Sequence, residues 1–219
     1  MGDGLKNYEL KAYFRLMQPN LIVILGPTAS GKTKLATHLA HSLRTEIISA
    51  DSRQVYRTMN IGTGKDLSEY TIDNTPIPYH LIDIINAGER YHIHQFTKDF
   101  FEAFNHIQTL NKIPILCGGT GLYIDAILSN YEYTSVPINE ELRVQLNSFS
   151  KPELETVFSE LHAHLYKNNI DTSTAKRLIR GIEIITYLHQ HDYTPTPFQT
   201  VNPIIFWNTC FGRKTQRQY

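Results

Sequence analysis

The sequence predicts an α/β fold, in which a parallel sheet is covered by helices and carries a small helical insertion. Short apolar runs alternate with stretches whose apolar residues recur at helical spacing. A glycine-rich segment lies between the first of these runs and the first helix. From Tyr131 onward, helical patterns follow one another without an intervening strand until Ile204.

Five short apolar segments are expected to form strands. Leu21–Leu25 (LIVIL) contains β-branched residues and lies between Asn20 and Gly26, which is typical of a strand buried on both faces. The other expected strands are Glu46–Ala50, His80–Ile84, Ile113–Cys117 and Ile204–Trp207.

Six segments have the spacing of helices. Lys32–Leu43 carries leucines four residues apart, and Phe96–Leu110 places its phenylalanines on one face. The others are Gly121–Leu128, Asn139–Phe149, Lys151–Leu165 and Thr172–His189. The alternation in the first part implies a parallel sheet. We therefore divide the chain into an α/β core (residues 1–130), a helical insertion (131–190) and a returning strand with a tail (191–219).

The charges balance over the whole chain but not along it. Lys plus Arg and Asp plus Glu both number 21, which argues against a surface devoted to nucleic acid. From Thr172 to Tyr219, however, the sequence contains six basic residues and only two acidic ones. Two cysteines are too few for a disulfide framework, and no apolar run approaches the length of a membrane span. We expect a soluble, cytoplasmic monomer that does not contact membranes.

The most specific local pattern is Gly26-Pro27-Thr28-Ala29-Ser30-Gly31-Lys32-Thr33, which matches G-x-x-x-x-G-K-[ST]. Glycines allow the backbone N–H groups to point at phosphate oxygens, and the following helix start favours the same anion. Lys32 adds a positive charge, and the Thr33 hydroxyl is placed to ligate Mg²⁺. The segment predicts a P-loop that binds a di- or triphosphate, in a P-loop NTPase-like fold.

Two further segments follow strands, so they should lie at the same edge of the sheet. Asp51 comes directly after Glu46–Ala50, where it can accept a proton from a nucleophile. The strand Ile113–Cys117 runs into Gly118-Gly119-Thr120 without an acid at its end. Because enzymes that hydrolyse nucleoside triphosphates usually hold their metal with such an acid, this is evidence against a motor or switch.

Four blocks of the sequence resemble the tRNA dimethylallyltransferase family, also called the tRNA isopentenyltransferases. They are LIVILGPTASGKT, EIISADSRQVYRTMNIGTGK, PYHLIDI and PILCGGTGLYIDAIL. The resemblance is dense from Leu21 to Leu128 and weaker through Asn139–Tyr187. It implies transfer of the dimethylallyl group of dimethylallyl diphosphate to the exocyclic amine of an adenosine beside the tRNA anticodon, with release of pyrophosphate.

The resemblance also implies roles for individual residues. Asp51 would be the general base, while Lys32 and a Mg²⁺ ion on Thr33 would stabilise the departing pyrophosphate. The diphosphate would be bound by Gly26, Pro27, Thr28, Ala29, Ser30, Gly31, Lys32 and Thr33. The tRNA anticodon stem-loop would be contacted by Asp51, Ser52, Arg53, Gln54, Thr120, Arg143, Lys176, Arg177, Leu178, Ile179 and Arg180. A phosphate-contacting arginine of the family would correspond to Arg213 or Arg217.

Three alternative functions remain open at this point. An adenylate isopentenyltransferase shares the fold and part of the four blocks, although the basic segment Lys176–Arg180 favours tRNA over a free nucleotide. A small-molecule kinase would hold ATP in the P-loop and use Asp51 to accept a hydroxyl proton. Because the family continues beyond the strand matched by Ile204–Trp207, the third alternative is a shortened, inactive chain that binds phosphate or RNA.

Overall fold

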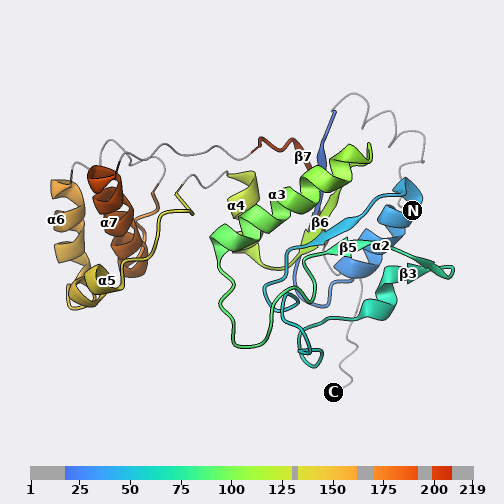
Figure 1. Cartoon of the computed structure of the whole chain (residues 1–219), viewed down its shortest axis with the longest axis horizontal. Helices are drawn as coiled ribbons and strands as arrows, with labels where there is room; N and C mark the ends of the chain where they lie inside the picture. Colours follow the sequence, from blue (N-terminus) through green and yellow to red (C-terminus); the bar gives the residue numbers. More distant parts are fainter. Residues whose placement is uncertain (1–17, 130–132, 162–169, 192–198, 209–219) are drawn as a thin grey trace, which may run out of the picture. The chain divides into compact units, whose positions relative to one another are not determined.

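The backbone follows the predicted alternation of strands and helices (Figure 1). The computed structural model describes residues 18–129, 133–161, 170–191 and 199–208. The chain divides into two units, which we call unit 1 (Met1–Asn130 with Gln199–Tyr219) and unit 2 (Tyr131–Phe198). The described strands all belong to unit 1, and the described part of unit 2 is built from helices.

Unit 1 is built on a five-stranded sheet of order β5-β2-β6-β1-β7, in which every neighbouring pair is parallel. The strands are β1 (Leu21–Leu25), β2 (Ile47–Ser49), β5 (Tyr79–His80), β6 (Ile115–Gly118) and β7 (Pro203–Trp207). All-apolar runs such as LIVIL form the central strands because helices cover both faces. The predicted parallel sheet is therefore confirmed.

One predicted strand is much shorter than expected, and one hairpin was not expected. His80–Ile84 contributes only its first residue to β5, because Leu81 and Asp83 adopt positive φ angles of 62° and 57°. Strands β3 (Thr71–Ile72) and β4 (Thr75–Pro76) form an antiparallel hairpin. The two residues between them also have positive φ, as a two-residue hairpin turn requires.

Helices cover both faces of the sheet. They are α2 (Lys32–Leu43), α3 (Ile93–Thr109) and α4 (Gly121–Leu128), with a short 3₁₀ helix, η1 (Leu67–Tyr70). Helix α2 packs on the face that carries Ile22 and Ile24. Val23 alternates with these two residues and points to the other face, where α3 and α4 pack together (Figure 1). There, Phe96, Phe100 and Phe104 of α3 are completely buried.

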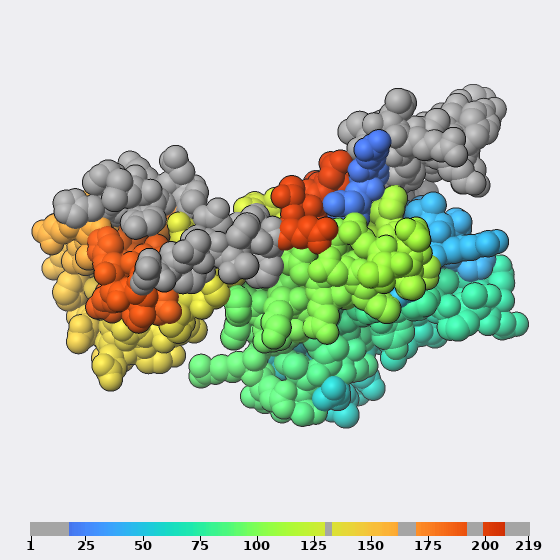
Figure 2. All heavy atoms as spheres, turned by 45° about the horizontal axis from the view of Figure 1, so that its top comes forward, coloured from blue at the N-terminus to red at the C-terminus, as the bar shows by residue number. Residues whose placement is uncertain are grey.

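Strand β7 brings a late part of the chain back to an early one. Pro203 pairs with Leu21 and Trp207 with Leu25 along the whole of β1. In Figure 2, the red-orange β7 lies against the blue start of the described chain. The last strand of unit 1 is therefore added only after unit 2 in the sequence.

The described part of unit 2 contains α5 (Glu140–Leu146), α6 (Lys151–Glu160) and α7 (Ala175–Gln190) around an apolar core. The helices begin at side-chain caps: the carboxylate of Glu153 accepts from the backbone and hydroxyl of Ser150, and Thr174 caps α7. The continuation expected for α6 through Leu165 lies mostly outside the described residues. Among the described helices, none is long and apolar enough to cross a membrane.

Candidate functional site

Loops at the carboxyl edge of the sheet enclose a cavity of about 530 Å³ in unit 1. Ligands of parallel α/β sheets bind at this edge, because the strand ends and helix starts meet there. The cavity is lined by Thr28–Thr33, Asp51–Gln54, Gly62–Gly64, Asp66, Glu69, Tyr70 and Cys117–Thr120. It therefore brings together the P-loop, the Asp51 segment and the Gly118-Gly119-Thr120 segment, which lie far apart in the sequence.

The P-loop has the backbone shape of an anion-binding turn. Gly31, with a φ of 83°, is the N-cap of α2, and Ala29 also has a positive φ of 60°. The ammonium of Lys32 donates a 2.6 Å hydrogen bond to the carbonyl of Pro27, so its charge is held within the loop. The start of α2 adds its own positive potential to the same place.

Asn208, the residue after β7, braces the P-loop from the neighbouring strand. Its side-chain amide donates to the carbonyl of Ser30 (3.0 Å), and its backbone N–H donates to the carbonyl of Leu25 (2.7 Å). A Cβ atom on Gly26 would lie 2.2 Å from the Asn208 carbonyl oxygen, which explains why residue 26 is a glycine. Asn208 is not among the residues predicted from the sequence, because no local pattern signals a contact across 178 residues.

Asp51 lies in a tight turn that fixes one of its carboxylate oxygens. Oδ1 accepts the backbone N–H of Arg53 (2.9 Å), and the Gln54 N–H donates to the Asp51 carbonyl (3.1 Å). Thr120 holds the same turn, since its hydroxyl oxygen accepts the Ser52 N–H at 3.0 Å. Within the described residues, no hydrogen bond occupies Oδ2 of Asp51, so this oxygen can accept a proton.

The side chain of Gln54 makes two hydrogen bonds to other parts of the protein. Its amide oxygen accepts from the Ser49 hydroxyl (2.9 Å), and its amide nitrogen donates to the Gly64 carbonyl (3.2 Å). The residue is only 9% exposed. Both ends of the amide are therefore used to connect β2 with the Gly62–Gly64 loop, and a contact of Gln54 with tRNA stays a prediction.

The polar part of the cavity fits a diphosphate with Mg²⁺. The Ser30 hydroxyl is buried and, among the described residues, has no hydrogen-bond partner, a deficit that a phosphate oxygen would correct. The described residues hold no cluster of three or more His, Cys, Asp or Glu suited to a metal. Mg²⁺ is commonly bound by substrate phosphates plus one or two protein groups, and Thr33, which lines the cavity, is one residue that could hold it.

Cys117 lines the cavity and Tyr123 does not, but burial keeps both of these groups protonated. Burial raises the pKa of Cys117 to about 12, although the Lys32 charge opposes this shift, so the thiol stays protonated. Burial also raises the pKa of Tyr123 to about 12, with smaller contributions from Tyr56 and Asp51. Neither group is therefore a nucleophile or base near neutral pH.

Gly118 is expected to tolerate no side chain. A Cβ atom there would lie 2.2 Å from the backbone oxygen of Ala50, whereas one on Gly119 would meet nothing closer than 4.0 Å. Gly118→Ala should therefore lower the free energy of unfolding by about 1–3 kcal/mol. Gly119→Ala, the matched control, should change it by about 0.5 kcal/mol at most. Chemical denaturation of both variants measures this difference, and equal stabilities would contradict it.

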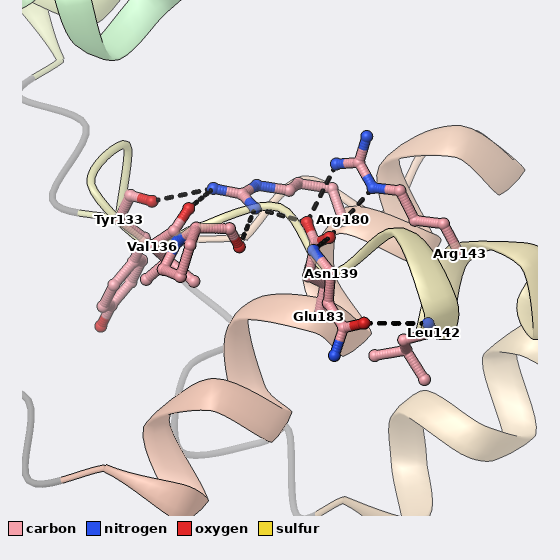
Figure 3. A network of polar contacts seen from close by, with 8 residues as sticks. Tyr133, Val136, Asn139, Leu142, Arg143, Arg180 and Glu183 are labelled. Carbon is pink, nitrogen blue, oxygen red and sulfur yellow. Dashed lines mark hydrogen bonds and ion pairs between the residues drawn. The ribbon is translucent and has the colours of Figure 1, made fainter.

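Arg143 and Arg180 of unit 2 are both committed to Glu183 (Figure 3). Arg143 makes a two-pronged contact with this carboxylate, at 3.0 and 2.9 Å. Arg180 binds the same carboxylate and also donates to the carbonyl of Val136 at 2.7 Å. The Glu183 side chain is 1% exposed, and it also accepts the Asn139 N–H. Two of the four arginines predicted to contact tRNA, Arg143 and Arg180, thus stabilise unit 2 through Glu183.

The rest of the predicted basic segment is divided between core and surface. Leu178 and Ile179 are 1% and 8% exposed, so their side chains pack in the core of unit 2, and a contact of these two residues with tRNA stays a prediction. Lys176 and Arg177 are exposed, and Arg177 binds Asp171 and Ser173. Arg213 and Arg217 lie outside the described residues.

Comparison with known families agrees with the fold and the P-loop. The model of the family described as IPP transferase matches residues 54–217. The chain belongs to the IPP transferase family. A second model, described as isopentenyl transferase, matches residues 19–77, which include the P-loop and Asp51.

Curated members of this family share about half of the aligned residues with the chain. The tRNA dimethylallyltransferase 1 of Parabacteroides distasonis is 48% identical over 84% of this chain, and that of Azobacteroides pseudotrichonymphae is 50% identical over 86%. The alignments cover 60% and 58% of those two proteins. The chain therefore spans about three fifths of the length of the curated relatives it matches.

Solved structures have the same P-loop NTPase-like fold. The tRNA isopentenylpyrophosphate transferase of Bacillus halodurans is 34% identical with a TM-score of 0.50, covering 77% of this chain and 56% of that one. A eukaryotic dimethylallyltransferase that acts on tRNA has a TM-score of 0.64 at 24% identity. The second match covers 86% of this chain and 48% of that one, and supports the fold alone.

Proposed function

We propose that this protein transfers the dimethylallyl group of dimethylallyl diphosphate to the exocyclic amine of an adenosine next to the tRNA anticodon. The observation that carries the proposal is the cavity in which the P-loop and Asp51 both lie. Membership of the IPP transferase family supports the same reaction, as do the names of the curated relatives.

In the proposed reaction, the amine nitrogen bonds to C1 of the dimethylallyl group while the bond from C1 to the diphosphate oxygen breaks. Oδ2 of Asp51 accepts the proton that the amine loses. The leaving pyrophosphate takes the electron pair, and the Lys32 ammonium and the P-loop N–H groups stabilise its charge. Mg²⁺ bound at Thr33 would supply further neutralisation of the leaving group.

The acceptor adenosine must leave its base stack to enter such a cavity, which suits an adenosine in an anticodon loop. Thr120 and the Asp51 turn would approach the nucleotide from unit 1, with Arg53 exposed at the rim of the cavity. In unit 2, exposed Lys176 and Arg177 are the proposed contacts to the RNA backbone. The relatives' names favour tRNA over adenylate or a small-molecule kinase substrate.

The test supplies labelled dimethylallyl diphosphate together with undermodified tRNA, with AMP, or without an acceptor. We expect label on tRNA, whereas label on AMP alone, or phosphate transfer from ATP without prenyl transfer, would contradict the proposal. Diphosphate binding without any transfer would support the inactive alternative.

Lys32→Ala is expected to weaken binding of dimethylallyl diphosphate about 10- to 100-fold, because it removes a charged hydrogen-bond donor from the P-loop. Lys34, which is exposed two residues further along α2 and does not line the cavity, is the matched control. Equilibrium binding of the labelled diphosphate measures both variants. Equal affinities of Lys32→Ala and Lys34→Ala would rule out the proposed diphosphate site.

A further inference from the structure

A buried lysine lies behind one wall of the cavity. Gly62, Thr63, Gly64 and Asp66 line this wall, but the Lys65 side chain between them points into the protein and is 0% exposed. Its ammonium lies 2.6 Å from Oδ1 of Asp83 and 2.7 Å from the Tyr56 carbonyl. Burying an ammonium ion is costly, and a buried ion pair adds little net stability. The position of Lys65 therefore calls for a role other than stability.

The Lys65–Asp83 pair connects the cavity wall to the Asp51 turn. The backbone N–H of Asp83 donates to the Gln54 carbonyl (3.0 Å), and the Gln54 side chain donates to the Gly64 carbonyl (3.2 Å). The Gln54 N–H in turn closes the turn at Asp51. These contacts link the Gly62–Asp66 wall, through Asp83 and Gln54, to Asp51, the proposed general base.

Asp83 is itself held in an unusual conformation. Its φ of 57° lies in the left-handed region, which is unfavourable for residues other than glycine. The next residue, Ile84, donates its N–H to the Val55 carbonyl at 2.8 Å, so the backbone on both sides of Asp83 is fixed to the segment that follows Asp51. The residue with this unusual backbone conformation is therefore also the one whose carboxylate binds the Lys65 ammonium.

We propose that Lys65 and Asp83 are positioning residues for the transfer reaction. Their ion pair holds the Gly62–Asp66 wall against the Asp51–Gln54 turn, so that the carboxylate of Asp51 faces a diphosphate bound in the P-loop. Neither side chain contacts substrate. The inference rests on the proposed function, because it assigns these residues to the same cavity.

The test compares Lys65→Met with Lys112→Met. Lys112 makes an ion pair with Glu46 at 2.9 Å, at the amino end of β2 and away from the cavity, so it is a matched control. Single-turnover transfer by Lys65→Met should fall about 100-fold, because a small displacement of a catalytic group has an effect of that size. Lys65→Met should bind dimethylallyl diphosphate with an affinity close to that of the parent. Lys112→Met should also transfer the dimethylallyl group at a rate close to that of the parent. A parent-like rate in Lys65→Met would overturn the proposal.

A double variant separates positioning from stability. Lys65→Met combined with Asp83→Asn removes both charges, and asparagine tolerates the left-handed backbone of residue 83. Because no unpaired charge is left behind, stability should recover. We expect the double variant to recover the melting temperature of the parent but not its transfer rate. If the rate returned together with the melting temperature, the pair would be structural only, and the proposal would be wrong.

Hydrogen exchange provides a readout that does not depend on activity. Backbone amides of residues 56–66 should exchange faster in Lys65→Met than in the parent, and at the parent rate in Lys112→Met. Unchanged exchange in Lys65→Met would contradict the positioning role even if the parent proved inactive. Failure of transfer by the parent protein, with the exchange difference present, would instead count against the proposed function alone.

Discussion

Asp51→Asn should slow dimethylallyl transfer at least about 100-fold and leave binding of dimethylallyl diphosphate unchanged. The asparagine side chain keeps an oxygen that can accept the Arg53 N–H, as Oδ1 of Asp51 does, so the turn is preserved. It cannot take the proton of the attacking amine. Since a general base contributes about 10²- to 10⁴-fold to a rate, single-turnover transfer should fall by a factor in that range.

Asp66→Asn is the matched control for this variant. Asp66 also lines the cavity, and its Oδ1 also accepts a backbone N–H two residues on, that of Ser68 at 3.0 Å. We expect this variant to retain far more activity than Asp51→Asn, while both bind the diphosphate. Transfer by Asp51→Asn near the parent rate would remove Asp51 from its proposed role.

Glu183→Leu should strongly destabilise unit 2. It leaves Arg143 and Arg180 without the carboxylate that both bind (Figure 3). Breaking a buried ion pair by removing one partner commonly lowers the free energy of unfolding by about 3–5 kcal/mol. Glu155→Ala breaks an exposed pair with Lys151, and should change this free energy by about 1 kcal/mol at most. Chemical denaturation distinguishes the two variants, and equal losses would contradict the prediction.

The same carboxylate should make unit 2 sensitive to acid. Burial alone would raise the pKa of Glu183, but hydrogen bonds from Arg143, Arg180 and Asn139 outweigh it and hold the pKa below the ordinary value of 4.5. The pair therefore stabilises the folded state above pH 4.5, and this contribution is lost as the pH falls through the lowered value. Unfolding measured between neutral and acidic pH should show a smaller loss of stability in Glu183→Leu than in the parent.

The parts of the fold and site that depend on local patterns could be predicted from the sequence. The P-loop, Asp51 and Gly118-Gly119 each follow an apolar strand, and the parallel sheet brings strand ends together. Other features depend on contacts between distant segments, as Asn208 does with the P-loop and Lys65 with Asp83. Such contacts leave no pattern in a single sequence.

Arg143 and Arg180 illustrate a different difficulty. A basic residue on an amphipathic helix can face solvent or a buried carboxylate, and the spacing is the same in both cases. Glu183 lies three residues after Arg180, but only the packing of α5 against α7 brings Arg143 to the same carboxylate. The charge pattern therefore locates the basic residues, but it does not show which of them are already bound to a carboxylate of the protein.

The pairing of β7 with β1 has a consequence for synthesis of the protein. The ribosome must complete all of unit 2 before Pro203–Trp207 and Asn208 emerge, so a nascent chain holds an unbraced P-loop until then. The entropic cost of closing the sheet around an inserted unit grows slowly with its length, by about 0.6 kcal/mol per doubling. Binding of diphosphate is therefore expected late in synthesis, after the chain has passed residue 208.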